Sequence, residues 1–346
     1  MKKLKILYLS KNMKEYKSAS YQEDVMDELS KQAEVFFYGP GFLDYNLNDS
    51  IENVIEKSPF KIDCIILGHS WLYDRDGAEV DPHPLLNLSN TKVPKVVILN
   101  KEYTNLEAKL AFIRKNYFNI GFTHHHDIKK YTKSTNVEFN FWPFAFGAKK
   151  FSSINKEKIF DIGFSGILQN LNKNAGQSDI RVGIMNFFFQ TLYDVPLVKK
   201  KSYRNIKIFW NSIPRSKLGR LLSKILYKHK FLDSKAYVEN LSKTKIYINT
   251  LSPMGLISPR FFESMASRSI VLCEASPLYS NIFPKGTYIE FKNDLSDFEE
   301  IVQSLLTNNT KKDKIVDKAY KLAYKEHTWE KRVSSLLNLI QKNLKS

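Results

Sequence analysis

Cysteine is nearly absent from this sequence, which has only two among its 346 residues. Each of them, Cys64 and Cys273, lies within an apolar run, where a free cysteine usually acts as a small buried hydrophobic side chain. The shortage argues against a disulfide framework and against a cysteine ligand pair, and it is typical of proteins from a reducing compartment. We therefore expect a cytoplasmic protein.

Long uninterrupted apolar segments are also missing. No stretch approaches the roughly 18 uncharged apolar residues of a membrane span. The opening residues 1–10 have a basic end but only a short apolar run, shorter than the core of a secretory signal. We expect a first β-strand there, and no membrane-spanning segment in the chain.

Acidic residues are outnumbered, with 36 Asp and Glu against 53 Lys and Arg, which gives a formal net charge of +17. Such an excess fits three kinds of partner: phosphorylated donors, anionic lipid surfaces and nucleic acid. Hydrophobic residues make up 43% of the chain and aromatic residues 13%, enough for packed cores, so a disordered chain is excluded. The length fits two domains of about 150 residues each.

The first half of the chain alternates predicted strands with predicted helices. The apolar runs at 63–69 and 95–100 are typical of strands in a parallel sheet that is covered on both faces. This pattern predicts a doubly wound α/β domain over residues 1–148. Further strands are expected at 4–10, 33–39 and 119–125, and helices at 21–32, 49–57 and 105–117.

A second α/β series follows an interruption near Pro143 and Gly147. The sequence there has neither helical nor strand periodicity, so we place the domain boundary at 145–157. The second domain is expected over 157–325, and a last helix, 326–346, is expected to pack back toward the first domain. Two such Rossmann-like domains form a cleft between the carboxyl ends of their sheets, which favours an enzyme that joins two substrates. Strands are expected at 158–166, 245–250, 269–274 and 286–291, and helices at 179–193, 233–243 and 259–267.

The most informative stretch is the loop and short helix between two of these strands. Ser258 can cap the helix, with Pro259 at its first position. The loop that contains Gly255 can bring free backbone N–H groups and the positive helix end onto a phosphate. Arg260 adds a bidentate cation, and the carboxylate of Glu263 can accept both hydroxyls of a ribose. The alternative is a solvated Arg260–Glu263 pair on a surface helix.

These residues resemble the donor-site signature of GT-B-fold glycosyltransferases of the "group 1" type. The Ser-x-Arg-x-x-Glu version in SPRFFESMASRSIVLCE is similar to the spore-maturation-protein-like subset. Four further segments are similar to the same proteins, so the resemblance covers about residues 150–340, and the first half only in its fold pattern. These segments are FDIGFSGIL (160–168), KTKIYINTLS (243–252), HTWEKRVSSLL (327–337) and FWPFAFGAKKF (141–151).

The resemblance implies a nucleoside-diphosphate sugar as donor, with Glu263 on its ribose and with Ser165, Gly166 and the 255–260 loop facing the diphosphate. It implies no cofactor and no bound metal, since helix dipoles with Arg or Lys take the place of a metal. The donor residues would then be Ser165, Gly166, Gly255, Ser258, Arg260 and Glu263. Two positions depart from the family pattern. Many retaining relatives have a second glutamate where this chain has Gly255, and relatives often have glycine followed by a small or apolar residue at Arg268–Ser269.

Candidate catalytic residues follow the apolar strands of the first domain. His69, Glu102 and His124 come after three such strands, where a His or Glu could remove the proton from an acceptor hydroxyl. Alternatively, His69 caps a turn, and Lys101 and Glu102 form a surface pair. The three consecutive histidines at 124–126 do not predict a metal site, because adjacent side chains diverge.

A basic segment, residues 198–230, contains 11 Lys or Arg and no acid. Its leucines recur at helical spacing beside a basic face, as in helices that lie on an anionic membrane. An ordinary helix with one core face and one solvated face has the same pattern. Nucleic acid is a third partner, although only Tyr203, Phe209 and Trp210 are interleaved with the cations.

The function expected from the sequence is glycosyl transfer to an acceptor hydroxyl in surface polysaccharide or glycolipid synthesis, with possible contact to the inner membrane face through 198–230. The alternative from another class is a non-catalytic or nucleic-acid-binding Rossmann-like protein. A nicotinamide-dependent enzyme is disfavoured because no strand is followed by a G-x-G-x-x-G turn.

Overall fold

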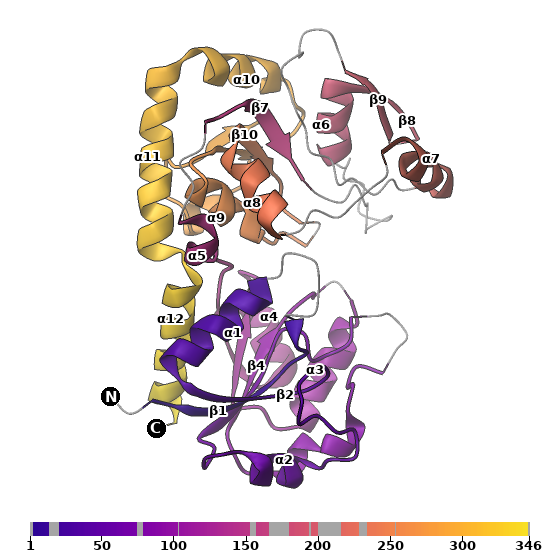
Figure 1. Cartoon of the computed structure of the whole chain (residues 1–346), viewed down its shortest axis with the longest axis vertical. Coiled ribbons are helices and arrows are strands. Elements are labelled where there is room, and N and C mark those ends of the chain that lie inside the picture. Colours follow the sequence, from indigo (N-terminus) through magenta and orange to yellow (C-terminus); the bar gives the residue numbers. More distant parts are fainter. Residues whose placement is uncertain are drawn as a thin grey trace. The chain divides into compact units, whose positions relative to one another are not determined.

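The computed structural model describes residues 3–13, 21–74, 79–102, 104–152, 157–165, 180–193, 195–199, 216–227, 234–252 and 254–344. The chain divides into two compact units. The first unit consists of Met1–Ala145 together with Trp329–Ser346, and the second consists of Phe146–Thr328 (Figure 1). Each unit has a parallel sheet of its own.

The sheet of the first unit has six parallel strands in the order β2-β1-β3-β4-β5-β6. Every residue of β3, β4 and β5 is buried, which explains their near-continuous apolar sequences. The strand order reverses at β1, which pairs with both β2 and β3, and ligands bind at such a point in open α/β sheets. The strands are β1 (Lys5–Leu9), β2 (Glu34–Tyr38), β3 (Cys64–Leu67), β4 (Lys95–Leu99), β5 (Ile120–Thr123) and β6 (Glu138–Phe141).

Five helices accompany this sheet in the described part of the first unit: α1 (Tyr21–Gln32), α2 (Ile51–Lys57), α3 (Leu106–Lys115), α4 (Ile128–Thr135) and α12 (Trp329–Asn343). The last helix, α12, joins the first unit by packing on α1. The rings of Tyr21 and Trp329 stack with their centroids 5.6 Å apart, and Trp142 Nε1 donates to the carbonyl of Arg332 at 2.9 Å. The chain's C-terminal helix is therefore part of the first unit's aromatic core.

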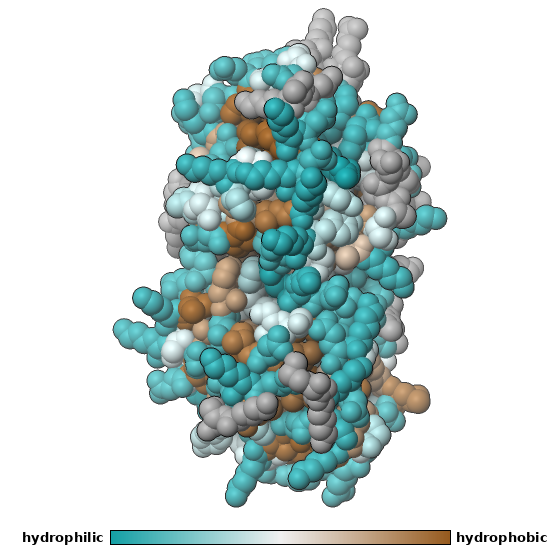
Figure 2. All heavy atoms as spheres, turned by 90° about the vertical axis from the view of Figure 1, so that its left-hand side faces the viewer, coloured by the Kyte–Doolittle hydropathy of each residue, from teal (hydrophilic) through white to brown (hydrophobic). Residues whose placement is uncertain are grey.

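The sheet of the second unit has four parallel strands in the order β12-β11-β10-β7. Its core lies between this sheet and the apolar faces of α6 and α10. The strands are β7 (Phe160–Phe164), β10 (Thr244–Asn249), β11 (Ile270–Glu274) and β12 (Ile289–Phe291). The helices are α5 (Ala148–Phe151), α6 (Ile180–Phe188), α8 (Ser234–Ser242), α9 (Pro259–Ala266), α10 (Phe298–Thr307) and α11 (Asn309–Glu326). The face that includes α11 is mostly hydrophilic (Figure 2).

A small hairpin and a helix lie apart from this sheet. The strands β8 (Phe189–Leu192) and β9 (Val195–Lys199) pair antiparallel in a sheet of their own. The helix α7 (Lys217–Tyr227) contacts β9, and both strands of the hairpin contact α6 (Figure 1). We call β8, β9 and α7 the hairpin–helix extension.

The predicted doubly wound α/β architecture is confirmed in both units. The prediction differs from the structure in several details. The helix expected at 179–193 ends at Phe188, because the next four residues pair with β9. The helix α4 and the strand β6 were not predicted, and β6 lies at the sheet edge, where it is only partly buried and shows no clear alternation. Among the described residues, no helix is long and apolar enough to cross a membrane.

Candidate functional site

The carboxyl ends of the second unit's strands carry the residues predicted to bind a donor. Ser165 follows β7, the loop that leads to α9 follows β10, and Glu274 ends β11. The helix α9 begins at Pro259, so Arg260 and Glu263 lie in its first turns. Gly166 lies outside the described residues.

Glu263 is held by a tyrosine from another helix. The hydroxyl of Tyr237, on α8, donates to Glu263 Oε2 at 2.5 Å. Burial raises the pKa of Tyr237 well above its usual value, the charge of Glu263 raises it further, and the nearby charge of Arg260 opposes the rise. Arg260 and Glu263 therefore belong to a partly buried cluster with Tyr237, which differs from the solvated surface pair considered as the alternative.

Ser165 is linked to the same region by a second tyrosine. Tyr247, in β10, donates its hydroxyl to Ser165 Oγ at 2.7 Å, and burial raises its pKa to about 12. Its ring lies against Gly163 of β7, where a Cβ would come within 3.0 Å of Tyr247 Cδ2. A glycine at this place in the strand therefore lets the tyrosine reach Ser165.

The loop after β10 is closed by hydrogen bonds among its own residues. Gly255 adopts a positive φ of 71°, and its N–H donates to the carbonyl of Ser252 at 2.9 Å. The N–H of Leu256 donates to Ser252 Oγ at 3.0 Å. The N–H of Gly255 is thus bonded within the loop, and the prediction that other N–H groups of this loop and the start of α9 face a phosphate stays a prediction.

Ser258 occupies the N-cap position of α9, but its side chain makes no capping hydrogen bond. The N–H of Phe261 donates to the main-chain carbonyl of Ser258 instead, at 3.2 Å. The Ser258 hydroxyl is buried without a hydrogen-bond partner among the described residues. The predicted N-cap position of Ser258 is therefore confirmed, although its side chain makes no capping bond, and this hydroxyl can still form a hydrogen bond beside Arg260.

Two charged residues that the sequence analysis missed fix the start of this loop. Arg181, in the first turn of α6, donates to Thr250 Oγ1 at 2.7 Å and to the carbonyl of Leu251 at 2.8 Å. Glu274 Oε1 accepts the N–H of Leu251 at 2.7 Å, and Glu274 Oε2 accepts the hydroxyl of Tyr279 at 3.1 Å. Their roles depend on contacts between distant segments, for which no local sequence signal exists.

In the first unit, the structure brings together two of the three predicted catalytic residues. His69 and His124 are each only 4% exposed, and their Nε2 atoms lie 2.9 Å apart. His124 Nδ1 lies 2.6 Å from the carbonyl of Trp142, so it must carry a proton and donate it. The neutral His124 then accepts at Nε2, and His69 donates from its own Nε2.

In this arrangement of protons, His69 Nδ1 carries a lone pair that neither histidine uses. That atom is buried without a hydrogen-bond partner among the described residues. Burial lowers the pKa of His69 well below its usual value, and burial also lowers the pKa of His124 to about 3. Both imidazoles are therefore neutral at pH 7, and both nitrogens of His124 are engaged. His124 is suited to orienting His69 rather than to accepting a proton itself.

Glu102 is buried, with 2% of its surface exposed. Its Oε1 accepts the hydroxyl of Thr123 at 2.6 Å, while its Oε2 has no hydrogen-bond partner among the described residues. Burial raises the pKa of this carboxyl group. The alternative surface pair with Lys101 is wrong, because Lys101 Nζ bonds to Asp74 Oδ2 at 2.8 Å.

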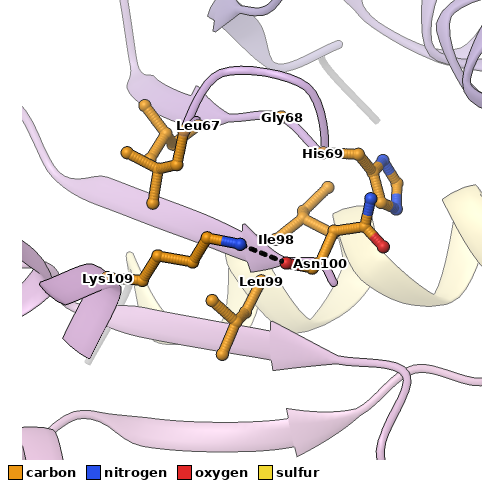
Figure 3. Close-up of a pocket in the computed structure, with 8 residues that line it drawn as sticks. Leu67, Gly68, His69, Ile98, Leu99, Asn100 and Lys109 are labelled. Carbon is orange, nitrogen blue, oxygen red and sulfur yellow. Dashed lines mark hydrogen bonds between the residues drawn. The ribbon is translucent and has the colours of Figure 1, made fainter. Parts of the chain in front are cut away.

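A buried lysine, also missed by the sequence analysis, holds the loop that carries Glu102. Lys109 is 1% exposed, and its Nζ donates to Asp74 Oδ1 at 2.8 Å and to the carbonyls of Asn100 and Lys101 at 3.1 Å each. Figure 3 shows this side chain reaching the Asn100 carbonyl across a small pocket that His69 also lines. This pocket lies at the carboxyl ends of β3 and β4, where His69, Asn100 and Lys109 provide its polar lining.

No group of three or more His, Cys, Asp or Glu side chains among the described residues is arranged to hold a metal ion. The rings of His125 and His126 stack on each other, with centroids 4.5 Å apart, instead of converging on one point with His124.

Comparisons with known proteins place this geometry in context. A sequence profile for a family described as "Glycosyl transferase-like" matches residues 199–338. No curated protein matches the chain in sequence. Among solved structures, a glycosyltransferase from Rickettsia africae is similar over 100% of both chains, with a TM-score of 0.63 and 10% identity.

Two further solved structures are similar over nearly the whole chain. HepE from Anabaena, in complex with UDP-glucose, has a TM-score of 0.61 and 9% identity, covering 98% of this chain and 100% of its own. Sucrose-phosphate synthase from Thermosynechococcus elongatus has a TM-score of 0.61 and 10% identity, covering 98% of this chain and 99% of its own. At such identities the likeness establishes the fold, and the GT-B fold predicted from the sequence is confirmed.

Proposed function

We propose that this protein is a glycosyltransferase that moves a sugar from a nucleoside-diphosphate sugar to an acceptor hydroxyl. The family profile over 199–338 supports this proposal, as does the likeness to HepE, which was solved with UDP-glucose. Fold alone does not assign an activity, so the proposal depends on the residues at the carboxyl end of the second unit's sheet.

The observation that carries the proposal is the cluster of Arg260, Glu263 and Tyr237. Tyr237 fixes the Glu263 carboxylate in one orientation at 2.5 Å, as a ribose-binding acid requires. Arg260, one turn earlier on α9, provides a cation for the diphosphate together with the positive end of the helix. The Ser258 hydroxyl, which has no hydrogen-bond partner in the part of the chain that the structure describes, is a further donor for the same group.

The reaction we propose breaks the bond between the anomeric carbon and the β-phosphate oxygen, and it forms a bond from that carbon to the acceptor oxygen. The nucleoside diphosphate leaves with the bonding electron pair, and Arg260 and the start of α9 stabilise its growing charge. We propose that these groups do so without a bound metal, and that the transferred sugar is a hexose. The proton of the acceptor hydroxyl passes to a base or to solvent.

His69 and Glu102 are the candidate bases, since His69 Nδ1 and Glu102 Oε2 are buried atoms without partners among the described residues. A base must reach the acceptor hydroxyl and have a matching pKa; burial raises the pKa of Glu102 and lowers that of His69, so Glu102 is the stronger base of the two. His124, with both nitrogens engaged, orients His69 through the bond between their Nε2 atoms.

The acceptor we propose is a growing surface polysaccharide or a lipid-linked saccharide, and the location we propose is the cytoplasm. Both cysteines are free and buried, which fits a reducing compartment.

A thermal-shift screen of the full chain tests the donor class. UDP, GDP, CMP and dTDP are compared with NAD and with a short DNA duplex. A ligand present at about 100 times its dissociation constant stabilises the native state by roughly 2.7 kcal/mol. We expect one nucleoside diphosphate to raise the melting temperature. A shift with DNA alone, disappearing as salt is raised, would contradict the proposal and favour nucleic-acid binding.

A further inference from the structure

Exposed apolar side chains gather on the hairpin–helix extension. Fourteen large hydrophobic side chains are exposed in the described part of the chain, and eight of them lie on this extension or in its turn. Monomeric soluble proteins rarely expose so many together without a partner. The eight are Leu192, Tyr193, Leu197, Val198, Leu218, Leu221, Ile225 and Leu226.

The helix α7 turns its small residues inward and its large apolar residues outward. Gly219 and Ser223 are buried, and the helix contacts β9. Leu218, Leu221 and Ile225 are 50%, 56% and 66% exposed, at a spacing that places them on one face. An ordinary surface helix buries its large apolar side chains, so the ordinary-helix alternative from the sequence does not fit α7.

Cations border this apolar face. Lys217, Arg220 and Lys224 are exposed and recur at spacings of three and four, so they share the neighbouring face of α7. Within residues 180–230 Asp194 is the one acidic residue, while residues 198–230 alone contain 11 Lys or Arg. A partner of this surface must therefore accept aliphatic side chains and carry negative charge.

We propose that the hairpin–helix extension docks on an anionic lipid bilayer, with Leu221 and Ile225 entering the headgroup–acyl boundary and Lys217 and Lys224 meeting the headgroups. A bilayer accepts both features at once. A second copy would bring like charges together, and the outer surface of a nucleic-acid duplex is mostly phosphate and sugar, which would leave most of these aliphatic side chains in water. This docking goes beyond the proposed sugar transfer and uses none of the donor-site residues.

Flotation of the full chain with lipid vesicles tests the docking. Vesicles of phosphatidylcholine alone are compared with vesicles that also contain phosphatidylglycerol. We expect binding to the anionic vesicles only. Leu221→Ser with Ile225→Ser should reduce that binding by roughly tenfold or more, because apolar burial is lost. Lys217→Gln with Lys224→Gln should reduce it to a similar extent, because each cation near the surface strengthens attachment.

Matched controls come from exposed residues elsewhere. Leu43→Ser with Leu85→Ser removes two exposed leucines of the first unit, and Lys314→Gln with Lys321→Gln removes two exposed lysines of α11. These controls should bind as the unaltered protein does. Equal loss in test and control variants, or no vesicle binding at all, would overturn the proposal.

The same variants distinguish a bilayer from the two other partners considered for this surface, a second copy of the chain and nucleic acid. Sedimentation analysis would reveal a dimer that Leu221→Ser with Ile225→Ser dissociates, and DNA anisotropy would reveal duplex binding that Lys217→Gln with Lys224→Gln abolishes. Either result without vesicle binding assigns the surface to another partner and overturns the docking. Nucleotide thermal shifts on each variant report the donor site separately and show that the variant is folded.

Discussion

At the scale of single residues, the buried imidazoles of His69 and His124 share one hydrogen bond and have one favourable arrangement of protons. His124 donates from Nδ1 to a carbonyl, and His69 donates from Nε2 to His124. Each neutral imidazole carries one proton, and a third proton on the pair would place a charge among the rings of Tyr21, Phe144 and Trp142. Burial lowers the pKa of both groups for this reason.

The first prediction concerns acid stability. In the unfolded chain both histidines bind protons below about pH 6.5, whereas in the folded chain they remain neutral to lower pH. The unfolded state then binds more protons, so the free energy of unfolding falls as pH falls below 6.5, by up to about 1.4 kcal/mol per pH unit for each histidine. Urea denaturation between pH 7 and 5 measures this slope. His69→Gln should flatten it, and His126→Gln, at an exposed position, should not. Equal slopes in all three proteins would contradict the assignment.

At the scale of elements, two neighbouring strands are shaped to bring a tyrosine to Ser165. A Cβ at position 163 would lie 2.9 Å from Thr244 Cγ2 and 3.0 Å from Tyr247 Cδ2. Both neighbours are buried in β10, so neither can move without disturbing the sheet.

We therefore predict that Gly163→Ala destabilises the second unit by about 1–3 kcal/mol, the usual cost of overpacking. It should also weaken nucleotide binding, because the Tyr247 ring is pushed away from Ser165. Gly183→Ala is the matched control, since its Cβ in α6 meets only the end of Leu295 and alanine favours a helix. Urea denaturation and nucleotide titration of both variants give the comparison, and equal behaviour would refute the packing argument.

The loop between β4 and α3 depends on one buried cation. Lys109 joins Asp74 to two main-chain carbonyls, and Lys101 in this loop adopts a positive φ of 51°. We predict that Lys109→Met costs about 3 kcal/mol of unfolding free energy, the lower part of the range for breaking a buried pair, because Asp74 keeps Lys101 as a partner. Lys115→Met, exposed on the same helix, should change stability by less than about 0.5 kcal/mol. A comparable loss in both variants would contradict the role of Lys109.

Most elements could be predicted from the sequence because they are continuous apolar runs, as in β3 and β4, or have apolar residues at helical spacing, as in α1. The strand β8 could not, because its residues continue the apolar pattern of α6 and become a strand only through pairing with β9. Among the candidate site residues, His69, Glu102 and His124 were proposed from their place after strands, and the structure shows all three buried there. Tyr237, Arg181 and Lys109 were missed, because contacts between distant segments give them their roles.

The departure of Arg268 from the family pattern also has a structural reason. It adopts a positive φ of 55° just after α9, the conformation that glycine favours at a helix end. Its guanidinium bonds to Asp317 at 2.7 Å and lies 4.0 Å from the ring centroid of Tyr320, both on α11. The chain therefore has a contact to α11 that a glycine could not provide.

At the scale of the whole molecule, charge and apolar exposure are distributed unevenly. The net charge of +17 is concentrated in part in residues 198–230, which include α7, whereas the residues proposed to bind the donor lie at the carboxyl end of the second unit's sheet. The proposed lipid-docking surface and the proposed donor site therefore consist of different residues. Substitutions on one should leave the other unchanged.

We propose that Glu263 binds the ribose of a nucleoside-diphosphate sugar, and isothermal titration of the nucleotide measures this contact. The unaltered protein is compared with Glu263→Gln and with Glu300→Gln, an exposed glutamate of α10. Hydrogen bonds to a charged group contribute about 1.5–3 kcal/mol, so Glu263→Gln should raise the dissociation constant by roughly tenfold to a hundredfold. Glu300→Gln should not change it. An unchanged affinity in Glu263→Gln would contradict the account.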